Sequence, residues 1–352
     1  MAPDPESAPP PPMQPLQPTS LAYALLIGQG RSGTNYLLGL LDQSPATHCR
    51  NEPDQLDSCA LGRLAPFRFF VDDEARLAGL YDEAVRQAAR CLGPRDHMTD
   101  VEKAWIRRGR RGVGYFYLRQ RYRAVERLIH RRKPMDGKEL VYPRWMVDTR
   151  KLERCFHVFK LNGAVGYGAW ALRERPASTV IHIVRHPGGF VKSWLKRWVR
   201  GEGGQERGKG NPDTLREEDR LREIARRDER WAKMLGDLDA IGREERELWW
   251  WRYLNEVLHR SGRGRANYRL VLYEDLARDP ERVSREAYGA YGLEWNADIA
   301  RRVRSISRGA EKIARAWKDE LEPRMVALVE KVMAGSSMER WWSEDGSSHA
   351  AA

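Results

Sequence analysis

The stretch that most constrains the fold of this chain is residues 21–35, LAYALLIGQGRSGTN, in which a short apolar run ends in a glycine-rich loop. Residues 21–27 predict a buried β-strand, and the apolar spacing of NYLLGLL, after Thr34, predicts a helix. A strand, a glycine-rich turn and a helix together direct backbone N–H groups and the positive end of the helix at one point. This arrangement predicts an anion site suited to phosphate or sulfate.

The side chains of this loop narrow the choice of ligand. Arg31 adds a permanent cation, and Ser32 and Thr34 add two hydroxyl groups. The loop lacks the GK[ST] ending of an NTP-hydrolysing P-loop, because its lysine position is not filled by lysine. The sequence therefore indicates a phosphate cradle for a ligand other than ordinary ATP or GTP.

Length, charge and cysteine content set outer limits. A chain of 352 residues can bury a large core, and one α/β domain is expected. The 62 Lys and Arg against 50 Asp and Glu favour anionic partners, although a merely soluble basic surface explains the same excess. The chain has four cysteines, Cys49, Cys59, Cys91 and Cys155, with no CxxC pair and no metal-ligand spacing among them. We therefore expect reduced thiols and no metal site.

We expect neither a signal peptide nor a transmembrane segment in this sequence. Residues 1–19 hold prolines and acids where a signal peptide has basic residues and an apolar core, which predicts a disordered proline-rich tail. No uninterrupted apolar run reaches transmembrane length. We expect a cytoplasmic protein with one domain over residues 20–342 and a flexible tail over residues 343–352.

Four apolar, β-rich runs recur along the chain with helical stretches between them, at residues 21–27, 155–161, 178–184 and 268–273. Such alternation predicts an α/β fold with a central parallel sheet and right-handed crossovers. Ligands of such sheets bind beyond the carboxyl ends of the strands. The loops GQGRSGT, NG and RHPGG, which follow the first three runs, are therefore expected to converge on one cleft.

A long insertion, residues 54–150, separates the first two of these strands. Apolar spacing within residues 115–133 predicts a helix there, and the neighbouring arginines suit either an acidic acceptor or a solvated face. The glycine-rich, charged residues 199–214 predict a lid or a disordered loop. Further helices are predicted at residues 215–236, at residues 243–260 and just before Gly335.

A second phosphate site is predicted within residues 180–198, VIHIVRHPGGFVKSWLKRW. A buried strand delivers Arg185 to its carboxyl end, and Pro187 can open the next helix. Ser193 lies on that helix, so an arginine and a hydroxyl can bind a second phosphate remote from the first cradle. Residues 270–283, LVLYEDLARDPERV, form another strand that runs into a turn and a helix.

Together these segments resemble the sulfotransferases whose donor is 3′-phosphoadenosine-5′-phosphosulfate (PAPS). GQGRSGTNYLLGLL resembles the family's 5′-phosphosulfate motif, and IVRHPGGFVKSWLKRW resembles its 3′-phosphate motif. VLYEDLARDP is similar to its YEDL turn, and AWKDELEP, residues 316–323, resembles a tryptophan-containing element of carbohydrate and bacterial members. The resemblance spans residues 21–323 outside the insertion. It implies a P-loop-NTPase-like three-layer fold, PAPS as donor and no required metal.

The resemblance assigns the donor contacts. The 5′-phosphosulfate is expected to lie against the loop residues Gly30, Arg31, Ser32, Gly33, Thr34 and Asn35. Asn35 stands where many members have Ser or Thr, so one hydroxyl is replaced by an amide. Arg185 and Ser193 are expected to bind the 3′-phosphate, which ATP lacks. By analogy with phosphoryl transfer, the protein mainly positions groups and supplies positive charge.

The resemblance also suggests the acid–base groups. Residues 42–53, DQSPATHCRNEP, resemble the stretch that carries a glutamate in carbohydrate and tyrosyl-protein sulfotransferases, and Glu52 maps onto it as candidate general base. A solvated carboxylate or an arginine partner is the alternative for Glu52. His48 is the second candidate base, or a surface loop histidine. Lys160, at the end of an apolar strand, stabilises developing charge or snorkels to solvent.

The expected function is sulfuryl transfer to an acceptor hydroxyl, on a glycan or glycolipid, with a peptide tyrosine or a small alcohol left open. A nucleotide or small-molecule kinase is the alternative, with Glu274 or Asp275 as Mg²⁺ ligand, although those acids are better explained as braces of the cleft. Residues 249–251, three tryptophans, are expected in the core rather than as a sugar platform. A nucleic-acid partner is not expected, because no nucleic-acid-binding motif is found.

Overall fold

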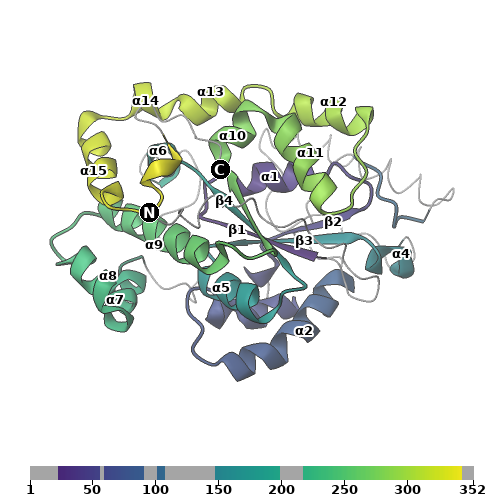
Figure 1. Ribbon diagram of the computed structural model, residues 1–352, viewed down its shortest axis with the longest axis horizontal. Coiled ribbons are helices and arrows are strands. Elements are labelled where there is room, and N and C mark those ends of the chain that lie inside the picture. Colours follow the sequence, from purple (N-terminus) through teal and green to yellow (C-terminus); the bar gives the residue numbers. More distant parts are fainter. Residues whose placement is uncertain (1–22, 56–58, 91–100, 108–146, 199–216, 343–352) are drawn as a thin grey trace, which may run out of the picture.

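A computed structural model describes residues 23–55, 59–90, 101–107, 147–198 and 217–342. Its centre is a five-stranded sheet in which all strands are parallel and the strand order is β2-β3-β1-β4-β5 (Figure 1). The strands are β1 (Tyr23–Gly28), β2 (Thr47–Asn51), β3 (Phe156–Asn162), β4 (Thr179–Val184) and β5 (Tyr268–Leu272). The predicted α/β fold around a parallel sheet is confirmed.

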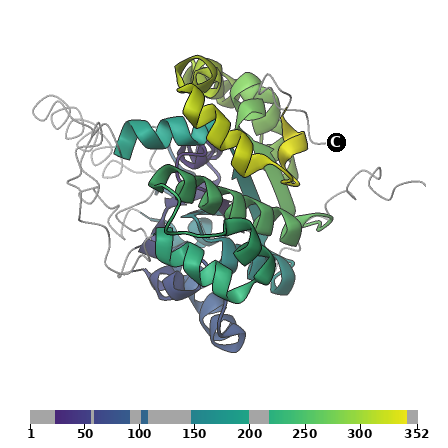
Figure 2. The same cartoon turned by 90° about the vertical axis from the view of Figure 1, so that its left-hand side faces the viewer.

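Helices cover both faces of the sheet and complete three layers (Figure 1). One face packs against α1 (Thr34–Leu41), α10 (Tyr273–Arg278), α11 (Pro280–Ala290), α12 (Ala297–Ile306) and α13 (Ala310–Arg315). The other packs against α2 (Glu74–Arg90), α5 (Val165–Glu174), α6 (Pro187–Trp198), α9 (Arg243–Gly262) and α15 (Pro323–Met333). The other α-helices of the described residues are α4 (Thr149–Glu153), α7 (Glu217–Arg227), α8 (Glu229–Leu235) and α14 (Trp317–Glu320). Both views place α2 and α12 at opposite ends of the molecule (Figure 2).

The apolar pattern of the first strand explains its central position. Leu25 and Ile27 belong to the core on the α5 and α9 side, whereas Ala24 and Leu26 belong to the core on the α1 side. All four side chains are fully buried. A strand that is covered on both faces has no polar alternation, which is why such a run is typical of an inner parallel strand.

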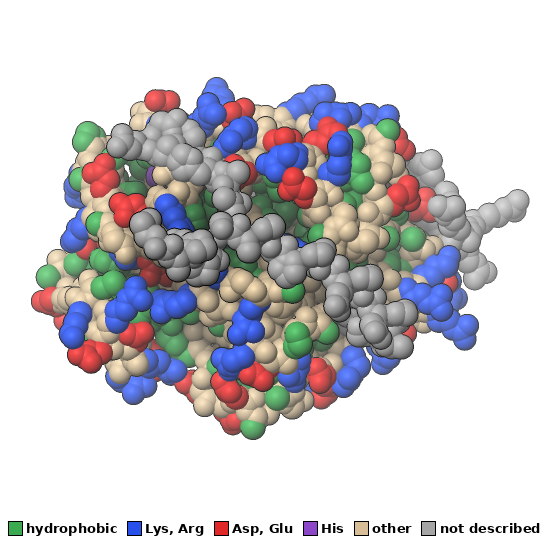
Figure 3. Space-filling model, viewed as in Figure 1, with side chains coloured by type: hydrophobic (Ala, Val, Ile, Leu, Met, Phe, Trp, Pro, Cys, Tyr) green, Lys and Arg blue, Asp and Glu red, His purple; other side chains and the backbone are tan. Residues whose placement is uncertain are grey.

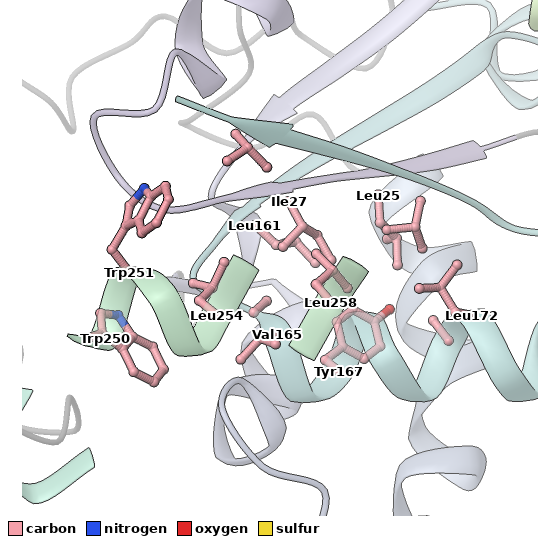
Figure 4. Close-up of a cluster of buried hydrophobic side chains, with 14 of the residues drawn as sticks. Leu25, Ile27, Leu161, Val165, Tyr167, Leu172, Trp250, Trp251, Leu254 and Leu258 are labelled. Carbon is pink, nitrogen blue, oxygen red and sulfur yellow. The ribbon is translucent and has the colours of Figure 1, made fainter. Parts of the chain in front are cut away.

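The larger core lies between the sheet and α9, where Leu254 and Leu258 meet Ile27 (Figure 4). The three tryptophans of α9 take part in this core, with exposed fractions of 6% for Trp249, 1% for Trp250 and 0% for Trp251. Their expected role as core residues is confirmed. Burial of aromatic rings of this size contributes about 2–3 kcal/mol each to the hydrophobic stabilisation.

The edge strand β2 is not among the strands predicted from sequence. Its residues, THCRN, are mostly polar, yet Thr47 and His48 are buried. The His48 ring meets the His157 ring with 3.1 Å between their Nδ1 atoms, and Lys103 Nζ lies 3.3 Å from Thr47 Oγ1. These partners are far away in sequence, so no local pattern predicts the strand. The insertion 54–150 consequently follows β2 rather than β1.

The helix predictions that fall on described residues are confirmed with one correction. The single helix predicted over residues 215–236 is divided into α7 and α8, because the Asp228 carboxylate accepts hydrogen bonds from the backbone N–H groups of Arg230 and Trp231. The other two lie where they are predicted, as α9 and α15. The stripe at residues 115–133, the loop at 199–214 and the tails at 1–19 and 343–352 lie outside the described residues.

The surface carries both signs of charge. On the face drawn in Figure 3, Lys and Arg side chains of the described residues are interspersed with Asp and Glu side chains rather than gathered in one patch. On α11 and α12, for example, Glu281 forms ion pairs with both Arg285 and Arg304. None of the helices in the described ranges combines the length and the apolar content that a membrane span requires.

The histidines inside the fold include His157, His182 and His186. His182 Nδ1 lies 2.8 Å from the Tyr268 hydroxyl, and its Nε2 lies 2.9 Å from Asn255 Oδ1. Burial lowers the pKa of His182 and that of His186 to about 3. Burial also lowers the pKa of His157, with a further effect from its charged neighbours. Each is therefore neutral in the folded state at neutral pH.

Acidification is expected to weaken the fold through these histidines. The unfolded chain protonates His182 near pH 6.5, whereas the folded chain does so near pH 3. The stability from this residue is therefore complete above pH 6.5 and is lost as the pH falls toward 3, by about 1.4 kcal/mol per pH unit. Urea unfolding curves measured across this range give the slope of stability against pH.

The variant His182→Asn isolates this effect. The slope of its stability against pH is expected to be smaller than that of the parent protein by about 1.4 kcal/mol per pH unit, which corresponds to one proton. The comparison is needed because burial raises the pKa of Glu274 and of Asp54, and a raised carboxyl pKa favours the folded state on acidification. An identical slope in both proteins would show that His182 is not held neutral.

Candidate functional site

The loop after β1 has the tight turn that the glycines predict. Gly28 leaves no room for a side chain, because a Cβ there would lie 2.6 Å from the carbonyl oxygen of Ile183. Gly33 has a φ of 90° and caps α1, and a Cβ on it would overlap the ring of Tyr273. Within the turn the Ser32 N–H donates to the Gln29 carbonyl at 3.0 Å. The loop therefore turns directly into the positive end of α1.

Three candidate donor-binding residues come together beside this loop. Arg31 Nε donates to Ser193 Oγ at 3.0 Å, across from β1 to α6. Arg185 Nη1 donates to the Arg31 carbonyl at 3.2 Å, and Arg185 Nη2 donates to the Ile313 carbonyl at 3.1 Å. The side chain of Arg31 thus links the two predicted phosphate positions, which the sequence places apart. Arg185 in turn connects the loop to α13.

Arg185 is held in an unusual environment for a cation. Its side chain is nearly buried, with 5% of the residue exposed, and its guanidinium lies 4.6 Å from the centre of the Tyr273 ring. Burial lowers the pKa of Arg185, and neighbouring Tyr273 and Glu274 partly oppose this effect. The guanidinium is kept out of water, and its hydrogen bonds given above go to two backbone carbonyls. Such a buried cation is suited to binding an anionic ligand.

Two buried polar atoms beside the β1 loop show whether a phosphate-bearing ligand fits there. Within the described part of the chain, neither Arg185 Nε nor Ser32 Oγ has a hydrogen-bond partner. Buried polar groups are paired in nearly all folded proteins, so each such atom requires an explanation. Both are donors beside the loop and the guanidinium, and phosphate oxygens would satisfy both.

A carboxylate and an ammonium group lie together at the ends of β2 and β3. Lys160 Nζ lies 3.8 Å from Glu52 Oε1 and donates to Asn51 Oδ1 at 2.7 Å. Only 1% of Lys160 is exposed, so the alternative that it snorkels to solvent is wrong. The Glu52 side chain is 20% exposed, which leaves it open to a ligand. The structure thus brings Glu52 and Lys160 to one edge of the sheet.

Asn162, which the sequence analysis did not single out, completes this pair. Its Nδ2 donates to Glu52 Oε1 at 2.5 Å. It also connects the pair to the loop, because a Cβ on Gly30 would lie 4.0 Å from the same nitrogen. The backbone carbonyl of Asn162 accepts a hydrogen bond from Arg68 Nε at 2.7 Å. The NG turn marks this position in the sequence, but only the strand order reveals its partner.

Strained backbone conformations occur at both of these places. Among the described residues other than glycine, only Arg31 and Glu52 have positive φ, at 78° and 50°. Such conformations cost of order 1–3 kcal/mol and persist where surrounding structure imposes them. Each follows the carboxyl end of a strand, and each carries a charged side chain toward the same edge of the sheet. The strain therefore coincides with the candidate site.

His48 is not brought to this edge. It lies within β2, buried to 2% exposure, where its ring meets His157 and the edge of Trp105. The alternative of a surface loop histidine is wrong. Its ring is held by His157 and Trp105 within the strand, whereas Glu52 lies after the end of the strand, so the geometry does not support His48 as a base.

The predicted bracing acids have distinct partners. Glu274 Oε1 accepts from the His186 backbone N–H at 3.0 Å, and its Oε2 accepts from Trp342 Nε1 at 3.1 Å. Glu274 thus braces the loop after β4 through hydrogen bonds, and burial raises its pKa. Asp275 instead pairs with Arg278 at 3.0 Å. Neither arrangement is that of a Mg²⁺ ligand.

The tryptophan of the AWKDELEP segment lies against the same loop. The ring of Trp317 stacks on His186, with 4.1 Å between centres and 11° between planes. A Cβ on Gly188 would lie 2.5 Å from this ring, so glycine is required there. In the described part of the chain, no group of three metal-ligating side chains is present.

Comparison with known proteins identifies the family. A sequence model of the sulfotransferase family matches residues 24–297, and the chain belongs to that family. No curated protein sequence matches the chain.

Solved structures of sulfotransferases are similar at low identity. The sulfotransferase domain of the olefin synthase of Synechococcus PCC 7002 is 17% identical, with 90% of this chain and 97% of that chain covered and a TM-score of 0.39. Sulfotransferase STF9 from Mycobacterium avium is 16% identical, with 90% and 76% covered and a TM-score of 0.39. Mouse sulfotransferase SULT7A1, complexed with PAP, is 11% identical, with 92% and 88% covered and a TM-score of 0.35.

Proposed function

We propose that this sulfotransferase uses PAPS as its donor and transfers the sulfuryl group to an acceptor hydroxyl on a carbohydrate or glycolipid, with Glu52 as general base. The observation that carries the proposal is the placement of a cation group and a carboxylate–ammonium pair along one edge of the sheet. Arg31, Arg185 and Ser193 lie after β1 and β4, Glu52 lies after β2, and Lys160 lies near the end of β3.

The donor is assigned to the loop side of this edge. The backbone and hydroxyl groups from Gly30 to Asn35 are placed to hold the 5′-phosphosulfate at the positive end of α1. Arg185 and Ser193 are assigned to the 3′-phosphate, for which the unpaired Arg185 Nε is a ready donor. A 3′-phosphate distinguishes PAPS from ATP, so these two residues set donor choice.

The transfer step follows from the same arrangement. The acceptor oxygen forms a bond to sulfur as the bond between sulfur and the bridging phosphate oxygen breaks, which releases 3′,5′-ADP. Glu52 takes the hydroxyl proton, and Lys160 stabilises the negative charge that develops on the leaving phosphate. Asn162 donates to Glu52 and so holds the carboxylate in place. Positioning and charge account for the catalysis, as in phosphoryl transfer.

The acceptor class rests on resemblance, and the cellular location rests on the cysteines, which are expected to be reduced thiols. The NEP and WKDEL segments are similar to those of carbohydrate-type members, which favours a sugar hydroxyl, and we infer a cytoplasmic enzyme. The kinase alternative is not favoured, because the loop has Thr34 where the P-loop pattern has lysine, and because Glu274 and Asp275 are bound to protein groups.

Calorimetric titration with 3′,5′-ADP, 5′-ADP and ATP with Mg²⁺ tests the donor. Tight binding of 3′,5′-ADP without metal and weak binding of the other two are expected, since only the first carries the 3′-phosphate. Preferential binding of ATP with Mg²⁺ would overturn the proposal and restore the kinase. Incubation with radiolabelled PAPS and a panel of sugars, glycolipids and tyrosyl peptides then tests the acceptor class.

Glu52→Gln is expected to lower the turnover number by about 100-fold or more while the affinity for 3′,5′-ADP stays within about twofold, because a general base contributes to transfer but not to donor binding. The measurement pairs initial rates with calorimetry. Glu286→Gln, which alters an exposed carboxylate paired with Arg282, is the matched control and is expected to keep full activity. Full turnover in Glu52→Gln would eliminate this residue as the base.

A further inference from the structure

A chain of contacts connects the last described residue of the protein to Arg185. Trp342 donates from Nε1 to Glu274, and Glu274 accepts the backbone N–H of His186, the residue after Arg185. Trp342 and Glu274 are buried, with 7% and 6% exposed. In sequence, 68 positions separate Trp342 from Glu274 and 88 separate Glu274 from His186. The carboxyl-terminal segment thus touches the loop that presents the guanidinium.

The loop is held from several directions at His186. Its ring stacks on Trp317 and meets the edge of Trp342, at 5.2 Å between centres and 82° between planes. Its Nδ1 accepts the Gly188 N–H at 3.0 Å, which requires the neutral ring that its lowered pKa provides. A residue fixed through its N–H, its ring nitrogen and the contacts of its ring with Trp317 and Trp342 allows little movement of the neighbouring Arg185 backbone.

Glu274 acts on Arg185 in two ways, through its hydrogen bond to the His186 N–H and through its charge. It is a buried carboxylate, and its charge acts on Arg185. Each Glu274 oxygen accepts one N–H group, from His186 and from Trp342. Loss of the Trp342 N–H would leave a buried carboxylate oxygen without that donor, which is costly and favours rearrangement of the side chain. The resulting shift would reach His186 first and Arg185 next.

We propose that Trp342 is a positioning residue for donor binding, which acts through Glu274 and His186 to hold Arg185 in place for the 3′-phosphate. The inference rests on the proposed function, because it takes Arg185 as the 3′-phosphate ligand. It adds a residue beyond the span matched by the family model, which ends at residue 297. The carboxyl-terminal segment is on this account part of the donor site.

The variant Trp342→Phe removes the N–H and retains a ring against His186. It is compared with Trp341→Phe, which makes the same change in the adjacent ring that lies against His259 instead. Calorimetry measures binding of 3′,5′-ADP and of 5′-AMP, which lacks the 3′-phosphate. Trp342→Phe is expected to weaken binding of 3′,5′-ADP by about tenfold and to leave binding of 5′-AMP within about twofold. Trp341→Phe is expected to change neither.

The selectivity between the two nucleotides separates positioning from general loosening of the fold. An equal loss for both nucleotides, or no loss for 3′,5′-ADP, would overturn the role of Trp342. If the parent protein itself does not prefer 3′,5′-ADP to 5′-AMP, the proposed donor fails and the inference fails with it. Should Trp342→Phe not fold, Glu274→Gln tests the same chain, since its amide would meet one of the two N–H donors. The same selective loss is expected there, and its absence would overturn the proposal.

Discussion

Replacement of Gly33 by alanine is expected to lower the free energy of unfolding by about 2–5 kcal/mol. The left-handed conformation at this position, with a φ of 90°, costs about 1–2 kcal/mol for a residue with a Cβ. Overlap of that Cβ with the buried ring of Tyr273 adds about 1–3 kcal/mol for overpacking. The displaced Tyr273 ring lies under the Arg185 guanidinium, so donor binding is expected to fall as well.

Urea unfolding of the parent protein and the variant measures the effect. The matched control is Gly79→Ala on α2, where a Cβ would meet nothing within 4 Å. Because glycine weakens a helix interior, this control is expected to gain about 0.5–1 kcal/mol. If Gly33→Ala proved as stable as Gly79→Ala, the loop would not depend on the backbone conformation described above.

Replacement of Arg185 by alanine is expected to weaken binding of 3′,5′-ADP by about 30-fold to several thousand-fold, which corresponds to about 2–5 kcal/mol for loss of one partner of a buried charge pair. The change removes the cation assigned to the 3′-phosphate. It also frees the carbonyls of Arg31 and Ile313, which Arg185 bridges. Arg185→Lys retains the charge without the fork and is expected to recover only part of the loss.

Calorimetry with 3′,5′-ADP and with 5′-AMP checks this assignment, and circular dichroism checks that the variant is folded. The loss is expected for 3′,5′-ADP only. Arg282→Ala, which removes an exposed arginine on α11, is the control and is expected to change affinity by no more than about twofold. Equal affinities of the parent protein and Arg185→Ala for 3′,5′-ADP would show that the 3′-phosphate binds elsewhere.

The parts of the fold that are local in sequence could be predicted from sequence. In β1 the apolar run, the glycine-rich turn and the helix are consecutive, so pattern and turn chemistry describe one unit. The same holds for β4 and α6, where Arg185 ends the strand and Pro187 opens the helix. Strand β2 differs, because Thr47 and His48 are buried by Lys103 and His157, partners that lie far along the chain.

The candidate site was predictable to a similar extent. The rule that ligands bind at the carboxyl ends of parallel strands brings Arg31, Arg185 and Lys160 to one edge. The contacts among them depend on the strand order β2-β3-β1-β4-β5, which no local pattern contains. Arg31 meets Ser193 across 162 positions, and Asn162 meets Glu52 across 110. The edge was therefore predictable and its hydrogen bonds were not.

The bond from Arg185 to the Ile313 carbonyl has a consequence for how the chain acquires its site during synthesis. The two residues are 128 positions apart, so Arg185 leaves the ribosome long before its second carbonyl partner exists. At about 5–20 residues per second this interval is on the order of ten seconds. During that time the β1 loop and the guanidinium can meet, yet the nascent chain lacks the support from α13. The surroundings of Arg185 are thus among the last parts of the nascent protein to reach their final structure.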